Sequence, residues 1–128
     1  MSLKKLNNKK QNDKTLSFSN FLKIILESWR LKTSYERVVP LLEVKEQKKN
    51  LSKIKWFENN LIEVLASCDL KLVTFDGEPY SSGIPATPVN IEDFDSEDDL
   101  YVKHTIEPTI IDERGSIVHS GSIIVEKA

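Results

Sequence analysis

Several residue types and motifs that mark enzymes and metal sites are scarce or missing in this chain. Cys68 is the only cysteine, which excludes an intrachain disulfide and a metal site built from cysteines alone. His104 and His119 have no nearby pattern of Cys or Asp ligands, so a zinc site is not expected. There is no glycine-rich phosphate loop and no nucleophile elbow. We therefore expect no enzymatic activity, no cofactor and no metal, and a protein that works through its surfaces.

Long apolar runs are missing as well. No stretch approaches the roughly 20 apolar residues that are needed to span a bilayer. The Lys/Asn-rich N-terminus lacks the apolar segment of a secretory signal. We therefore expect a cytoplasmic protein with no membrane partner. The 128 residues suffice for one domain, or for a helical half and a β half that share the chain.

The small net charge of −2 conceals a strong asymmetry along the chain. Residues 1–56 contain fourteen Lys and Arg against five Asp and Glu, a balance of +9. Residues 57–128 contain four against fifteen, a balance of −11. Such polarity steers the approach of partners but does not determine the fold. The basic residues are mostly lysines scattered among Asn, Gln and Ser with few aromatics, so nucleic acid is not the expected partner.

The N-terminal half divides into a tail and a helical region. Residues 1–16 are polar, lysine-rich and aperiodic, which predicts a disordered basic tail. A helix is expected to begin at Ser19 or Asn20, either of which can cap it, and to break at Pro40. A looser heptad-like pattern follows, and Asn50 or Ser52 could cap a fresh start, so it predicts one kinked helix or two short ones.

Apolar residues at helical spacing predict how this region, residues 17–68, packs. The first stripe begins at Phe18 and includes Leu22, and Leu26 widens it. It offers more apolar surface than a short pair of helices can hide, so we expect a homodimer through the helical half. The side chains expected in the core or the dimer seam are Phe21, Ile25, Trp29, Leu51, Ile54, Leu61 and Leu65.

Residues 69–128 carry the patterns of a small β-domain. Asp69 is expected to end the helical region in a left-handed conformation. A strand over 70–75 and a turn at Asp76-Gly77 follow, and then an irregular loop over 78–90. The acidic run 92–99 has oxygen ligands for calcium but lacks the glycine and the spaced carboxylate of an EF-hand loop. It is expected to be a solvated loop.

The end of the chain predicts a compact antiparallel β-unit. Apolar and polar residues alternate over 100–107, the period of a half-buried strand. The run 112–115 predicts a turn between two apolar pairs, and a closing strand places Ile123 and Val125 on one face with Ile124 opposite. The predicted fold class is therefore α+β: N-terminal helices in a dimerising hairpin or bundle, followed by a small antiparallel β-domain.

The order of elements from residue 54 onward resembles the GrpE family, the nucleotide-exchange factors of DnaK-type chaperones. The features that carry the resemblance are a helix over 54–65, the strand 70–75, the turn Asp76-Gly77, the segment 105–110 and the ending 115–125. They cover somewhat more than half of the chain. The resemblance implies a helical dimer whose β-domain opens the chaperone's nucleotide-binding domain and releases ADP.

The resemblance also implies where the partner would bind. In the family, the turns and the exposed face of the last hairpin contact the chaperone. On this chain that surface would carry Arg114, Ser116, His119 and Ser120. Family members usually have arginines where this chain has Ser116 and His119, which leaves Arg114 as the one permanent cation. The alternative is a protein-interaction or adaptor module that keeps the fold without exchange activity.

Overall fold

A computed structural model describes residues 17–128 of the chain, so the tail predicted over residues 1–16 lies outside the described residues. The first element is the helix α2 (Phe18–Val38). Its N-cap is Ser17, whose hydroxyl oxygen accepts a hydrogen bond from the amide of Asn20 at 3.1 Å. The predicted caps at Ser19 and Asn20 were therefore wrong by two to three residues, because Ser17 is the residue that keeps an extended backbone.

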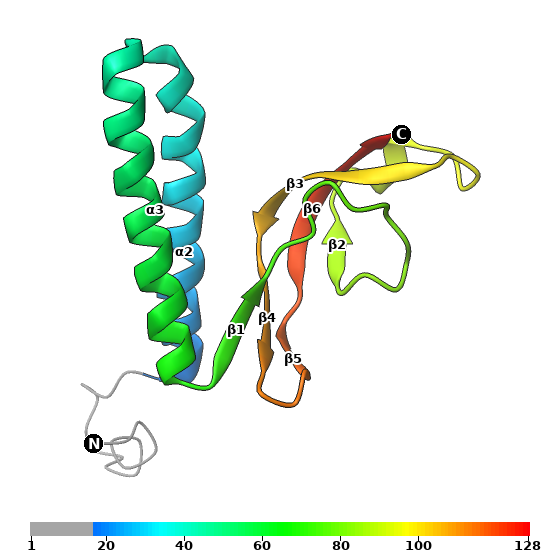
Figure 1. Cartoon of the computed structure of the whole chain (residues 1–128). Helices are drawn as coiled ribbons and strands as arrows, with labels where there is room; N and C mark the ends of the chain where they lie inside the picture. Colours follow the sequence, from blue (N-terminus) through cyan, green and yellow to red (C-terminus); the bar gives the residue numbers. More distant parts are fainter. Residues whose placement is uncertain (1–16) are drawn as a thin grey trace.

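The helix ends where Pro40 was expected to end it. A 3₁₀ turn, η1 (Val39–Leu41), follows Val38 with Pro40 in its first turn. The side-chain amide of Gln47 donates to the carbonyl oxygen of Leu42 at 2.9 Å and secures this connection to the next helix. Figure 1 shows the connection at the free end of an antiparallel helical hairpin.

The second helix, α3 (Val44–Ser67), is one uninterrupted element of 24 residues. The prediction of a fresh start at Asn50 or Ser52 was wrong. Both side chains donate to carbonyl oxygens one turn earlier, Asn50 to Glu46 at 2.7 Å and Ser52 to Lys48 at 3.1 Å. A polar side chain that bonds back in this way is accommodated within a helix instead of capping a new one. The helix ends before Asp69, which has the expected left-handed conformation with φ of 59°.

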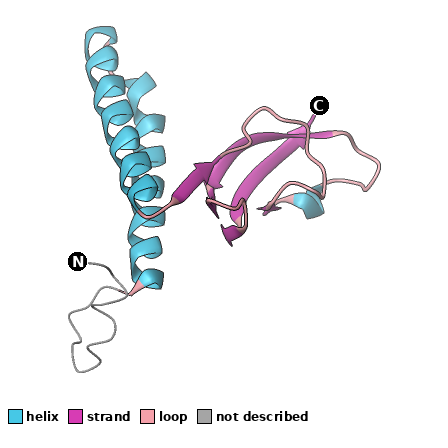
Figure 2. Cartoon of the chain, turned by 60° about the horizontal axis from the view of Figure 1, so that its bottom comes forward, coloured by secondary structure: helices cyan, strands magenta, loops and turns pink. Residues whose placement is uncertain are grey.

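The β half contains two three-stranded sheets (Figures 1 and 2). The inner sheet has the order β1-β4-β5 and is antiparallel throughout. Its strands are β1 (Leu70–Val73), β4 (Thr109–Asp112) and β5 (Ile117–His119). The outer sheet has the order β2-β6-β3, and its strands are β2 (Ala86–Pro88), β3 (Leu100–Glu107) and β6 (Gly121–Lys127). The pairing of β2 with β6 is parallel, so the β half is mostly but not wholly antiparallel.

Strand β3 departs from the alternation that the sequence predicted. Val102 lies opposite Val125, but His104 lies opposite Ile124, so β3 carries one extra residue at Lys103. This bulge exchanges the two faces of the strand at His104 and Thr105, and a second register shift follows between Thr105 and Glu107. Thr105 is therefore buried, whereas His104, which the pattern placed on the apolar side, is only half-buried. Strand β6 has no such defect, and Ile123 and Val125 share the buried face as predicted.

Two apolar cores hold the molecule together. The first joins the helical hairpin to the inner sheet, and its buried members are Ile25, Trp29, Leu61, Leu65, Leu70 and Ile110. The second lies on the outer sheet, and its buried members are Ala86, Leu100, Val102, Ile123 and Val125. The first core crosses from α3 into β1, so the helices and the inner sheet pack as one unit. The outer sheet extends away from the hairpin (Figure 2).

This arrangement confirms the predicted α+β class, with a helical hairpin followed by small sheets. Within residues 17–128, neither helix combines the length and the apolar character that a bilayer crossing requires.

Candidate functional site

The four residues predicted to face a partner lie at two places, not one. Arg114 and Ser116 belong to the turn between β4 and β5, and both are exposed. His119 and Ser120 lie at the other end of β5, where the chain passes from the inner to the outer sheet. The four residues therefore flank the short strand β5, two at each of its ends.

The turn between β4 and β5 is held by the side chain and the carbonyl group of Asp112. The Oδ1 atom of Asp112 accepts hydrogen bonds from the amides of Arg114 and Ser116, each at 2.9 Å. The amide of Gly115 donates to the carbonyl oxygen of Asp112 at 3.0 Å, and Gly115 has φ of 84°, which favours glycine. The side chain of Arg114 thus projects from a rigid tip.

The corner is the place where two strands change sheets together, and we use that name for residues 107–109 and 119–121. Strand β3 continues through Pro108 into β4, and β5 continues through Ser120 into β6. A Cβ on Gly121 would lie 2.4 Å from the carbonyl oxygen of Glu107 and 2.8 Å from the carbonyl carbon of Pro108. Only glycine permits this approach of the two backbones.

A buried threonine ties the corner to the loop before β2. The hydroxyl of Thr109 donates to the carbonyl oxygen of Pro85 at 2.6 Å and accepts from the amide of Gly121 at 3.0 Å. Ser120 donates to the same carbonyl oxygen at a longer 3.4 Å. The buried Thr109 hydroxyl therefore both donates and accepts a hydrogen bond, as buried polar groups generally require.

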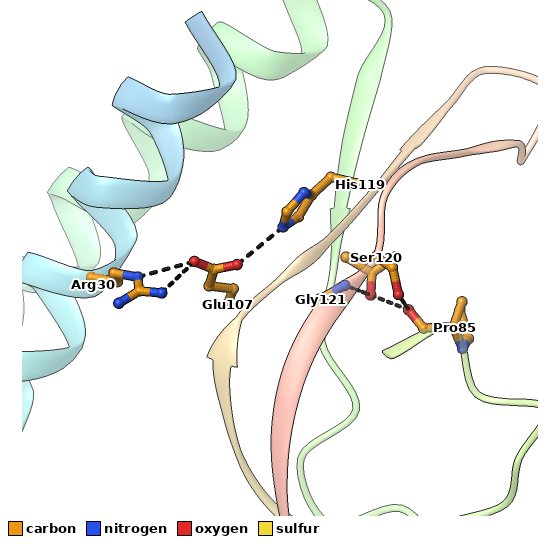
Figure 3. Close-up of polar contacts among 7 residues, drawn as sticks. Arg30, Pro85, Glu107, His119, Ser120 and Gly121 are labelled. Carbon is orange, nitrogen blue, oxygen red and sulfur yellow. Dashed lines mark hydrogen bonds and ion pairs between the residues drawn. The ribbon is translucent and has the colours of Figure 1, made fainter. Parts of the chain in front are cut away.

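His119, one of the predicted partner-binding residues, is half-buried and also contacts a carboxylate within the chain. Its Nε2 atom lies 3.1 Å from Oε1 of Glu107. The other carboxylate oxygen of Glu107 accepts two hydrogen bonds from Arg30, from Nε at 3.0 Å and from Nη2 at 2.6 Å. Figure 3 shows Glu107 between the two, so that one carboxylate links α2, the end of β3 and the end of β5.

The surroundings of Glu107 shift its pKa. Partial burial raises the pKa of this carboxyl, but hydrogen bonds from Arg30 and His119 and their charges outweigh that effect. The net result is a pKa below the ordinary value of 4.5. The Arg30–Glu107–His119 cluster therefore fixes the orientation of the corner relative to the helices at neutral pH.

A polar cleft of about 460 Å³ separates the helical hairpin from β3. Lys32 is buried at its edge, with Nζ 3.6 Å from the centre of the Trp29 ring. The same ammonium lies 3.0 Å from Glu36 and 3.7 Å from Glu58. Its charge is thus balanced within the chain, as a buried cation requires.

Of the seven side chains predicted for the core or the dimer seam, five are already buried within one chain. These are Ile25, Trp29, Ile54, Leu61 and Leu65, and Phe21 packs against them. Leu51 does not, because about half of its surface is exposed. The predicted seam residues therefore form the core of the hairpin itself, and a second chain would have to use other residues.

Such residues lie on the outer face of the hairpin, the face turned away from the sheets. On α2 this face carries Ile24, Leu31 and Tyr35. Arg30 and Arg37 contact the β-strands. Because successive residues of a helix are about 100° apart, the outer face points in a different direction from these two arginines. A groove of about 310 Å³ runs between Leu31, Tyr35, Trp56 and Phe57, among others. The exposed apolar side chains of the outer face are Ile24, Leu31, Tyr35, Val38, Trp56 and Val64.

Metal chemistry finds no support in the part of the chain that the structure describes. No group of three or more His, Cys, Asp and Glu side chains there could hold a metal ion. The acidic run over 92–99 begins within the 3₁₀ turn η2 (Ile91–Asp93). A second turn follows, in which the amide of Asp98 donates to the carbonyl oxygen of Asp95 at 3.0 Å.

Sequence reasoning missed Arg30 and Glu107, which are 77 residues apart. No local pattern marks either residue, since a charged residue on a helix or at a strand end is ordinarily solvated. Comparison of the chain with protein-family models, with curated proteins and with solved structures found no match.

Proposed function

We propose that this protein is a GrpE-like co-chaperone, which binds the nucleotide-binding domain of a DnaK-type chaperone and promotes the release of ADP. The observation that carries the proposal is the architecture: a helical hairpin followed by two small sheets, from which a rigid turn presents Arg114 to solvent. The same order of elements underlies the resemblance of residues 54–125 to that family.

The proposed mechanism is differential binding. A β-domain that fits the open, nucleotide-poor form of the chaperone better than the closed form shifts the population toward the open form. For this, the β-domain must keep its position relative to the helices when the chaperone's nucleotide-binding cleft closes around it. The Arg30–Glu107–His119 cluster and the continuous core between α3 and β1 support this role, because they hold the sheets to the helices.

A homodimer through the helical half is part of the proposal. The outer face of the hairpin exposes six large apolar side chains, and the burial of each contributes roughly 1.5–3 kcal/mol when it is complete. A second copy of the same hairpin would cover this face and complete a four-helix bundle. Packing of this kind also presents two β-domains from one scaffold.

The contact at Arg114 is tested by calorimetry with a purified DnaK-type chaperone in its nucleotide-free form. A charge-assisted contact contributes about 1.5–3 kcal/mol, so Arg114→Ala is expected to weaken binding by roughly ten-fold or more. The control is Lys71→Ala, which removes an exposed cation from β1, at the opposite edge of the same sheet. If the two variants bound the chaperone with equal affinity, the turn between β4 and β5 would not be part of the interface.

The second candidate is an adaptor that keeps the architecture without exchange activity. It is favoured by Ser116 and His119, which occupy the positions where the resembled family usually has arginine. Neither supplies a guanidinium fork, and His119 already contacts Glu107. An adaptor would bind the chaperone without accelerating nucleotide release, so affinity and release must be measured on the same preparation.

A further inference from the structure

The free end of the helical hairpin exposes aliphatic side chains that nothing in residues 17–128 covers. We call residues 37–55 the hairpin tip. Leu41 is 83% exposed and Val44 is 82% exposed, and about half of the surface of Val38 and of Leu51 is exposed. Figure 1 shows the connection between α2 and α3 at the end of the hairpin farthest from β1, so a large flat partner has unobstructed access to it.

This exposure is imposed by the local structure. Val39 is 2% exposed and anchors the 3₁₀ turn against the hairpin. Gln47 donates to the carbonyl oxygens of Leu42 at 2.9 Å and Pro40 at 3.4 Å, and it fixes the connection from the other side. Leu41 is therefore held outward between two anchors. Two almost fully exposed aliphatic side chains, Leu41 and Val44, at one end of the hairpin are the kind of feature that marks an interaction surface.

The hairpin tip is also strongly basic. It contains six Lys and Arg against two Asp and Glu, a balance of +4. The only ion pair between these residues joins Lys45 to Glu43 at 3.8 Å, and both side chains are mostly exposed, so the pair offsets little of the positive field.

Cations and aliphatic side chains alternate on one side of α3. Val44, Lys48, Leu51 and Lys55 follow each other at spacings of three or four residues and line a shallow groove of about 410 Å³. Residues at this spacing share one face of a helix. An apolar surface with lysines beside it is typical of helices that lie in the interface of a membrane with anionic lipids.

A lipid surface fits this combination better than nucleic acid does. Residues 37–55 contain no aromatic side chain that could stack on a base. Phosphate contacts along a duplex use the cations and leave exposed Leu41 and Val44 without a role. A bilayer engages both, since aliphatic side chains enter the headgroup region while lysines contact lipid phosphates.

We propose that the hairpin tip binds the surface of membranes that contain anionic phospholipids, with Leu41 and Val44 inserted among the headgroups and Lys48 and Lys55 on the lipid phosphates. The sequence pattern predicted no membrane partner, because the exposure of Leu41 and Val44 follows from the fold and not from composition. This proposal is independent of chaperone binding, which uses the opposite part of the molecule.

Vesicle co-sedimentation tests the proposal with the full chain at low salt. The probes are vesicles of one-third phosphatidylglycerol in phosphatidylcholine, and vesicles of phosphatidylcholine alone. Binding is expected only to the anionic vesicles and should fall as salt is added. Lys48→Gln and Lys55→Gln should each weaken binding about five-fold, the equivalent of about 1 kcal/mol per cation.

The aliphatic contribution is tested with Leu41→Asp and Val44→Asp, at positions so exposed that folding should be unaffected. Each should weaken vesicle binding ten-fold or more, whereas Val89→Asp, at an exposed position just after β2, should weaken it much less. The absence of binding to anionic vesicles would overturn the proposal. Binding that survives the aliphatic substitutions, or binding to duplex DNA in place of vesicles, would overturn it as well.

Discussion

The substitution Gly121→Ala tests the close approach of the two strands at the corner. The added Cβ would meet three backbone atoms, the oxygen of Glu107 at 2.4 Å, the carbon of Pro108 at 2.8 Å and the nitrogen of Thr109 at 2.9 Å. None of these can rotate away, as the end of a flexible side chain would. The two strands must therefore move apart.

The magnitude follows from two effects. Overpacking of this kind costs about 1–3 kcal/mol. The separation also lengthens the hydrogen bond from the Gly121 amide to Thr109, whose net contribution is about 0.5–1.5 kcal/mol. The reduced backbone entropy of the unfolded chain offsets about 0.4–1 kcal/mol. We expect a net loss of about 2–3 kcal/mol in the free energy of unfolding.

The assay is denaturant unfolding followed by circular dichroism, at one protein concentration so that association does not alter the comparison. Gly83→Ala is the matched control, because its Cβ would meet only Ser81 Oγ at an ordinary 3.7 Å. That variant should stay within about 0.5 kcal/mol of the parent protein. Equal stability of the two variants would mean that the corner is not packed as described.

Three further predictions concern the outer sheet, the pH response and assembly. Val125→Asp places an unpartnered charge at a position that is 1% exposed. The near-ultraviolet circular dichroism of the outer sheet should disappear, while the far-ultraviolet signal of the helices persists. Unchanged thermal melting would refute the register of β6. Because the pKa of Glu107 is lowered in the folded state, its stabilising contribution is present above the ordinary value of 4.5 and lost as the pH falls below it. Glu107→Gln should remove that part of the acid dependence, and identical pH profiles of the two proteins would contradict the cluster. Leu31→Glu, on the outer face, should weaken a homodimer by about 100-fold in light scattering, through lost burial and a buried charge. Leu51→Glu, on the other side of the hairpin, should leave the dimer affinity unchanged. A parent protein that is monomeric at tens of micromolar would refute the predicted homodimer.

The parts of the fold that the sequence predicted are those governed by local rules. Pro40 ends α2, Asp69 adopts the left-handed conformation after α3, and Ile123 and Val125 alternate with Ile124. Each follows from the geometry of one residue or from a period of two.

The misses came from effects that act between distant residues. The bulge at Lys103 depends on the pairing of β3 with β6, and a single strand's pattern carries no sign of it. Asn50 and Ser52 have the side chains of caps, but in the continuous helix α3 each donates to a carbonyl oxygen one turn earlier. The role of His119 depends on Glu107 and Arg30, which only the three-dimensional fold brings together.

The most direct test of the proposed function is stopped-flow release of fluorescently labelled ADP from a DnaK-type chaperone of the same organism. If this protein prefers the nucleotide-poor form, its addition should accelerate release at least ten-fold, saturably with concentration, and Arg114→Ala should shift the half-saturating concentration upward. Tight binding with an unchanged release rate would contradict exchange activity and leave the adaptor as the function of this fold.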